Sequence, residues 1–140
     1  MKTKWGLTVR GICEFNKKIL LLKIHSTSAH DAGKWEIPGG KVKKNEFFDE
    51  ALIREYTEET GLKINIESLF NVVENKYKAC KSKEDINSIQ LIMKVTCDND
   101  NVRISQEHDE YGWFSIDEIN EMINNNLLTN PACNAFLVTK

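Results

Sequence analysis

The 140-residue sequence has few of the residues that break regular structure, with 7 glycines and 2 prolines. This composition excludes collagen-like and mucin-like chains and does not fit a disordered protein. Long hydrophobic runs are also missing, because the longest purely aliphatic run, Ile19 to Leu22, ends at Lys23 and is far too short for a membrane span. The start of the chain lacks an apolar core of signal-peptide length. We therefore expect a soluble cytoplasmic protein with one domain over residues 1–140 and no membrane partner.

Metal-binding and redox motifs built on cysteine are absent as well. The four cysteines are too far apart for a Cys-x-x-Cys motif: Cys13, Cys80, Cys97 and Cys133. Two disulfides would need an export signal, so scattered reduced thiols are the preferred interpretation. The three histidines form no metal-ligand spacing with one another or with a cysteine, and we take His25 and His30 as ordinary surface or loop residues.

Charge is nearly balanced overall but is unevenly distributed. The net charge of −2 argues against broad binding to nucleic acid or to a membrane surface. Residues 46–60 contain six acidic side chains and a single base, Arg54. The chain has therefore concentrated its acid in one short stretch.

The pattern of apolar and turn-forming residues predicts a mixed-sheet α/β or α+β sandwich with helices packed outside the sheet. Asn16-Lys17 is expected as a hairpin turn, residues 26–34 as a loop, and residues 46–60 as a helix between Asn45 as N-cap and Gly61 as C-cap. The expected strands cover 5–15, 18–24, 35–42 with a break at Pro38-Gly39-Gly40, 64–77, 87–97, 102–104 and 111–114. Two further helices are expected, one opened by the capping-box spacing of Ser115 and Glu118 and one running from Asn130 to Leu137.

Three glutamates of the acidic helix share one face, since Glu55, Glu58 and Glu59 stand at i, i+3 and i+4. A solvated charged face is the ordinary explanation of such a pattern. Here, however, Phe48 and Leu52 fall on the same side, which is expected to pack on the sheet. Like charges at i and i+4 repel, and the helix C-terminus is unfavourable for anions. A divalent cation would compensate for these placements, and oxygen ligands favour Mg²⁺ or Mn²⁺ over zinc.

Two neighbouring features can be interpreted in the same way. Gly39-Gly40 is either an ordinary turn or a place where the backbone comes close to a metal or a phosphate, because no side chain intervenes. Arg54 either pairs with Glu50 or Glu58 along the helix, or orients a glutamate that binds the metal.

The segment GKVKKNEFFDEALIREYTEETGL, residues 40–62, resembles the Nudix box. That motif is a glycine, five residues, a glutamate, seven residues, then Arg-Glu-aliphatic-x-Glu-Glu-x-Gly-aliphatic. Eight of its nine specified positions match: Gly40, Glu46, Arg54, Glu55, Glu58, Glu59, Gly61 and Leu62. The departure is Tyr56, which replaces the aliphatic residue. WEIPGG at 35–40 and EHDEYGWFSIDEI at 107–119 also resemble the family.

The resemblance implies the Nudix fold, an α/β/α sandwich with a mixed sheet, and the Mg²⁺-dependent hydrolysis of a nucleoside diphosphate linked to another group, X. Mn²⁺ is a substitute. It implies that Glu55, Glu58 and Glu59 bind the metal, that Gly40 offers its carbonyl, and that Arg54 orients a glutamate. Glu46 would hold the loop before the helix.

The resemblance also implies a further acid in the late segment. Alignment through Trp113 points to Glu110, which we expect as another metal ligand or as the general base.

The identity of X follows only by elimination. ADP-ribose hydrolases of the family carry a proline about 15 residues after the box, where this chain has Tyr77, and the signatures of other subfamilies are missing. A MutT-like nucleoside triphosphate pyrophosphatase is the leading hypothesis, with a small-molecule nucleotide as substrate; a homodimer is left open. The alternative is a Nudix-fold nucleotide-binding or sensor module without catalysis. Five aromatic residues are candidates to stack on a base, although core packing explains each more simply: Trp5, Trp35, Phe70, Tyr77 and Trp113.

Overall fold

The structure is a computed structural model that describes residues 3–137, which form seven strands and three helices. In chain order these elements are β1 (Lys4–Phe15), β2 (Lys18–Ile24), β3 (Trp35–Glu36), β4 (Gly39–Lys41), α1 (Phe48–Thr60), β5 (Ile64–Lys78), β6 (Asp85–Cys97), β7 (His108–Phe114), α2 (Ile116–Asn124) and α3 (Asn130–Leu137). No helix within this described part of the chain is long and apolar enough to cross a membrane.

Strand β1 is the organising strand of a mixed sheet with the order β3-β2-β1-β6-β5. It pairs in parallel with β6, from Lys4 opposite Ile86 to Cys13 opposite Val95, whereas its pairings with β2 and β4 are antiparallel. Strand β7 continues the sheet beyond β2. Because β4 is held against the middle of β1, the loop that precedes α1 begins next to the centre of the sheet.

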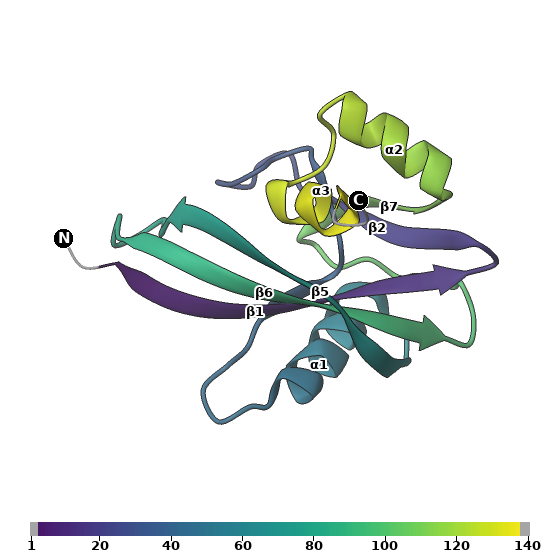
Figure 1. Ribbon diagram of the computed structural model, residues 1–140, viewed down its shortest axis with the longest axis horizontal. Coiled ribbons are helices and arrows are strands. Elements are labelled where there is room, and N and C mark those ends of the chain that lie inside the picture. Colours follow the sequence, from purple (N-terminus) through teal and green to yellow (C-terminus); the bar gives the residue numbers. More distant parts are fainter. Residues whose placement is uncertain (1–2, 138–140) are drawn as a thin grey trace.

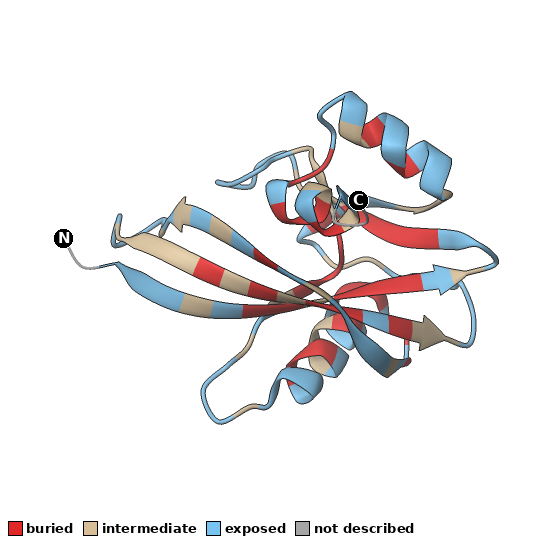
Figure 2. Cartoon of the chain, in the orientation of Figure 1, coloured by how far each residue is buried: buried red, intermediate tan, exposed pale blue. Residues whose placement is uncertain are grey.

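The helices lie on both faces of the sheet, with α1 on one side and α2 and α3 on the other (Figure 1). Alternation along β1 divides the core accordingly: Val9 and Cys13 pack with Leu52 of α1, whereas Ile12 packs with Ile119 of α2. Buried residues gather where the strands cross and on the inner sides of the helices (Figure 2). The expected α/β/α sandwich with a mixed sheet is confirmed.

The hairpin between β1 and β2 turns at Asn16-Lys17, as the sequence predicted. Both residues have positive φ, 51° and 65°, which is the signature of a two-residue type I′ turn. Phe15 and Lys18 face each other directly beside this turn.

Helix α1 begins two residues later than predicted, and its N-cap is Phe47 rather than Asn45. Asn45 has a φ of 67° and lies in a turn in which the backbone N–H of Glu46 donates to the carbonyl of Lys43 over 3.1 Å. The carboxylate of Glu50 accepts a hydrogen bond from the N–H of Phe47 over 2.9 Å and so satisfies the helix start. The C-cap prediction is confirmed, since Gly61 is left-handed with a φ of 73°.

The predicted strand at 102–104 is wrong. Val102 is buried as its hydrophobicity suggested, but the backbone N–H of Arg103 donates to the carbonyl of Thr60 over 2.8 Å. This segment therefore caps the end of α1 instead of pairing with a strand. The strand expected at 111–114 starts earlier, at His108.

Tyr56, the departure from the family motif, is fully buried and its hydroxyl donates to the carbonyl of Gly11. Burial raises its pKa well above the ordinary value. A Cβ at residue 11 would lie 3.0 Å from Cε2 of the tyrosine ring. The large side chain of Tyr56 on α1 thus fits because Gly11 on β1 has no side chain.

All four cysteines are free thiols, as expected. The Sγ atoms of Cys13 and Cys97 lie 3.2 Å apart beneath α1. Burial raises the pKa of the Cys13 thiol, which keeps it protonated.

Candidate active site

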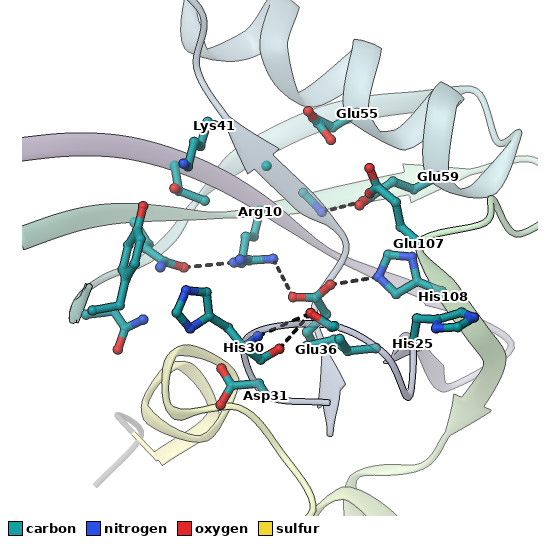
Figure 3. Close-up of a pocket in the computed structure, with 18 of the residues that line it drawn as sticks. Arg10, His25, His30, Asp31, Glu36, Lys41, Glu55, Glu59, Glu107 and His108 are labelled. Atoms are coloured by element: carbon teal, nitrogen blue, oxygen red, sulfur yellow. Dashed lines mark hydrogen bonds and ion pairs between the residues drawn. The ribbon is translucent and has the colours of Figure 1, made fainter. Parts of the chain in front are cut away.

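A cavity of about 810 Å³ opens between α1, β4, the loop after β2 and the start of β7. Helix α1 contributes Glu55 and Glu59, β4 contributes its glycines, and the turn before β7 contributes Glu107 (Figure 3). The opposite part of the lining carries basic and aromatic side chains, among them Lys41 and His30. The cavity therefore has an acidic end and a basic end.

Glu59 is the most deeply buried of the helix acids, with 4% of its surface exposed. Its Oε1 accepts a hydrogen bond from the backbone N–H of Gly39 over 3.0 Å. Burial and the nearby negative charge of Glu36 raise the pKa of Glu59 to about 9, although the Gly39 N–H works in the opposite direction. In the absence of a cation, this carboxyl group is protonated at neutral pH.

Glu55 lies directly against the backbone of Gly40. A Cβ at residue 40 would come within 2.4 Å of the Glu55 carboxyl carbon, so any side chain there would displace the carboxylate. Burial raises the pKa of Glu55; Arg54 opposes this rise, and the charges of Glu58 and Glu107 add to it. The absence of a side chain at residue 40 thus lets the Glu55 carboxylate lie against the backbone, and close approach of a metal or a phosphate to this glycine stays a prediction.

Arg54 joins the loop before α1 to the acids of the helix. Its Nε and Nη2 donate to the two carboxylate oxygens of Glu46 over 2.7 and 3.0 Å, and its Nη1 donates to Oε1 of Glu55 over 2.8 Å. Nη2 also donates to the carbonyl of Lys41 over 3.2 Å. Of the two interpretations of Arg54, the geometry favours the one in which it orients Glu55, although it also reaches Glu58 over 3.4 Å.

Glu58 is exposed and lines a smaller hollow next to the cavity, together with Glu59 and Glu107. Glu107 lines both hollows. Glu55, Glu59 and Glu107 therefore line one end of the cavity, and Glu58 lies in the adjoining hollow.

Glu110 is not among them. It lies on β7 opposite Lys23 of β2, and its carboxylate pairs with the Lys23 ammonium over 3.2 Å while remaining 58% exposed. Glu110, which the alignment through Trp113 singled out, therefore does not line the cavity. The acid of this segment that does is Glu107, three positions earlier, in the turn just before β7.

A buried charge network on the cavity floor was not predicted from the sequence. Glu36 of β3 accepts from Nη1 of Arg10 over 3.3 Å, and its other oxygen lies 2.7 Å from Nε2 of His108. Arg10 also donates to the side chain of Gln90 over 2.8 Å. Burial alone would raise the pKa of Glu36, but Arg10 and His108 outweigh it and hold the pKa below its ordinary value. No spacing signal could reveal contacts between residues 26 and 72 positions apart.

The residues present fit a hard divalent cation. Carboxylate oxygens converge from two segments, a side-chain-free glycine leaves room beside Glu55, and Glu59 is buried without a basic side chain bonded to it among the described contacts. Ligand atoms of Glu36, Glu59 and His108 also lie within 4.8 Å of one another. Glu36 is already paired with Arg10 and His108, whereas the described contacts of Glu59 include only the Gly39 N–H, so its carboxylate has capacity for a cation.

The chain is similar in sequence and in fold to known proteins of one family. The NUDIX domain profile matches residues 4–131. Nucleoside triphosphatase NudI of Escherichia coli K12 is 30% identical over 105 residues, covering 71% of this chain and 74% of NudI. The low-salt glycan biosynthesis protein Agl8 of Haloferax volcanii is 36% identical over 85 residues, covering 59% of this chain, and the match spans about half, 54%, of Agl8.

Among solved structures, the MutT protein of Methanosarcina mazei Go1 superposes with a TM-score of 0.78 at 26% identity, over 97% of this chain and 93% of that one. The chain belongs to the Nudix family and is a Nudix hydrolase. Enzymes of this family act on small nucleotide substrates, and the acidic end of the cavity is suited to the divalent metal that they generally use.

Proposed function

We propose that this protein is a Mg²⁺-dependent nucleoside triphosphate pyrophosphatase of the MutT type. The observation that carries the proposal is the cavity itself, with three carboxylates at one end, a fourth in the adjoining hollow, and the Lys41 ammonium at the other end. The similarity to NudI, named a nucleoside triphosphatase, and to a MutT protein supports the substrate class.

In this proposal Glu55, Glu58, Glu59 and Gly40 hold the metal, with Mn²⁺ as a substitute. Bound Mg²⁺ supplies charge neutralisation of the phosphates and lowers the pKa of water. Glu107, rather than the expected Glu110, serves as a further ligand or as the base. Our reason is that Glu107 lines the cavity and Glu110 does not.

The chain's own groups act chiefly by position. Arg54 fixes the carboxylate of Glu55, and the Gly39 N–H fixes that of Glu59, so neither rotates during the reaction. Water adds to phosphorus, the P–O–P bridge breaks, and the water proton passes to a carboxylate, which returns it to the products. The products are a nucleoside monophosphate and pyrophosphate.

A panel of nucleoside triphosphates, dinucleoside polyphosphates and nucleotide sugars, assayed with Mg²⁺ for released pyrophosphate or phosphate, tests this function. We expect pyrophosphate from a nucleoside triphosphate, and loss of about 10²-fold or more in kcat for Glu59→Gln. Binding across the panel without turnover would instead support the sensor hypothesis. Near-normal turnover by Glu59→Gln would remove the helix acids from the mechanism.

A further inference from the structure

The basic end of the cavity contains an aromatic corner that the hydrolytic groups do not use. Tyr77 of β5 and His30 of the loop after β2 meet edge to face, with ring centroids 5.8 Å apart and an interplanar angle of 67°. The ammonium of Lys41 lies 5.7 Å from the centroid of the Tyr77 ring. Sγ of Cys80 lies 3.2 Å from Nε2 of His30 and holds the imidazole at this place.

The five aromatic residues that are candidates to stack on a base differ in whether they line the cavity. Trp35 packs edge to face on Phe114 with centroids 5.1 Å apart, and Trp113 packs against Phe15 at 6.1 Å. Trp5 and Phe70 are exposed, but they do not line the cavity. Tyr77 is the one of the five that does.

Strand β4 connects this corner to the acidic end within two consecutive residues. Gly40 lies against the Glu55 carboxylate, and the next residue, Lys41, reaches over the Tyr77 ring. Figure 3 shows Lys41 and His30 on one side of the cavity and Glu59 and Glu107 on the other. A molecule with phosphates beside the glutamates would therefore extend past a lysine ammonium to an aromatic ring.

We propose that Tyr77 and His30 form the subsite for the nucleobase of the substrate, while Lys41 faces the phosphates or ribose between base and metal. The inference rests on the proposed function and narrows it, because it requires a substrate with a planar base. Diphosphates without a base would lack this contact. Stacking on an aromatic ring accepts every base, since each has a π-face. The subsite thus provides affinity for nucleotides rather than a choice among them.

Calorimetric binding of ATP, GTP, CTP and UTP, with inorganic tripolyphosphate as the ligand without a base, tests the subsite. Ca²⁺ replaces Mg²⁺ so that binding is measured apart from turnover. Tyr77→Ala is expected to weaken binding of the nucleotide with the highest affinity by about 5- to 150-fold, and tripolyphosphate by less than about twofold. Tyr77→Phe should bind like the wild type. The matched control is Phe70→Ala, an exposed aromatic residue of the same strand.

Equal weakening of nucleotide and tripolyphosphate, or no weakening of either, would overturn the subsite, as would binding of tripolyphosphate with no nucleotide binding at all. The two proposals fail separately. Nucleotide hydrolysis with a KM indifferent to Tyr77→Ala would leave the function and remove the subsite. Nucleotide binding that depends on Tyr77 but is not followed by hydrolysis would support the subsite and overturn the proposed function.

Discussion

At the scale of single residues, the buried carboxyl group of Glu59 makes the metal-free stability of the protein depend on pH. Its pKa is raised to about 9 from an ordinary value of 4.5, so between these pH values the folded protein holds a proton that the unfolded chain has lost. Metal-free stability therefore falls as pH rises through this window.

Glu59→Gln removes this dependence, so the metal-free variant should equal the wild type near pH 4.5 and become increasingly more stable than it towards pH 9. Urea unfolding of both proteins in chelator, at several pH values, measures the difference. The comparison cancels titrations common to both proteins. A difference that stays constant or shrinks as pH rises would show that Glu59 is ionised without metal.

The choice between Glu107 and Glu110 makes a second residue-scale prediction. Glu107→Gln should lower kcat more than it changes KM, because the carboxylate matters most where charge develops. Glu110→Gln is the matched control and should retain near-normal kcat, since it loses only an exposed pair with Lys23. Steady-state kinetics at saturating Mg²⁺ measures kcat for both variants. A larger loss of kcat in Glu110→Gln than in Glu107→Gln would show that Glu110 is the site residue.

The sequence could predict those site residues that lie close together along the chain. The i, i+3, i+4 glutamates and Gly40 depend on one helix and one turn, and the structure brings them together. The contact of Glu36 with His108 depends instead on how β3 and β7 both flank β2. The choice between Glu107 and Glu110 depends on where β7 begins, and boundaries of that kind are poorly specified by local pattern.

At the scale of elements, the β1–β2 hairpin has a turn residue poorly suited to its backbone. Lys17 has a φ of 65°, a conformation that crowds its Cβ and favours glycine. Lys17→Gly should therefore raise the free energy of unfolding by about 0.5–1 kcal/mol, with activity unchanged, because asparagine-glycine is the preferred type I′ pair.

The neighbouring Lys18→Gly is the control for that substitution. Lys18 is the first residue of β2 and is exposed, so glycine there only adds backbone entropy and should destabilise by about 0.5–1 kcal/mol. Urea unfolding midpoints at unchanged m-value measure both. If Lys17→Gly destabilises as much as Lys18→Gly does, the turn is not type I′ in solution.

Most elements were predictable because their ends carry local signals, such as Gly61 at the end of α1 or the capping box of Ser115 and Glu118. The segment at 102–104 was not. Its apolar residues alternate as in a strand, but its backbone donor is taken by the carbonyl of Thr60. The tertiary position of a segment decides which partner its backbone N–H and C=O groups bond to. The alternation of apolar and polar side chains along the segment does not encode that position.

At the scale of the whole molecule, metal binding, proton release and stability should be coupled. Because Glu59 is protonated near pH 7 without metal, Mg²⁺ must displace its proton. Adding Mg²⁺ to chelator-treated protein should therefore release close to one proton per bound ion and raise Tm as the metal concentration increases.

Calorimetry in two buffers of different ionisation enthalpy measures that proton, and NaCl at matched ionic strength is the control. The Glu59→Gln variant should release much less than one proton per bound Mg²⁺. Tight Mg²⁺ binding by the wild type without proton release would exclude Glu59 as a ligand.

The parallel pairing of β1 with β6 also affects the order in which the chain folds during synthesis. Ile12 lies opposite Lys94, so at about 5–20 residues per second the ribosome makes the partner of β1 roughly 4–16 s after β1 itself. Meanwhile β1 can form its hairpin with β2, yet the residues that β6 will cover stay exposed to other nascent chains. During this interval the strand that organises the finished sheet lacks its parallel partner, and its unpaired edge is open to pairing with other chains.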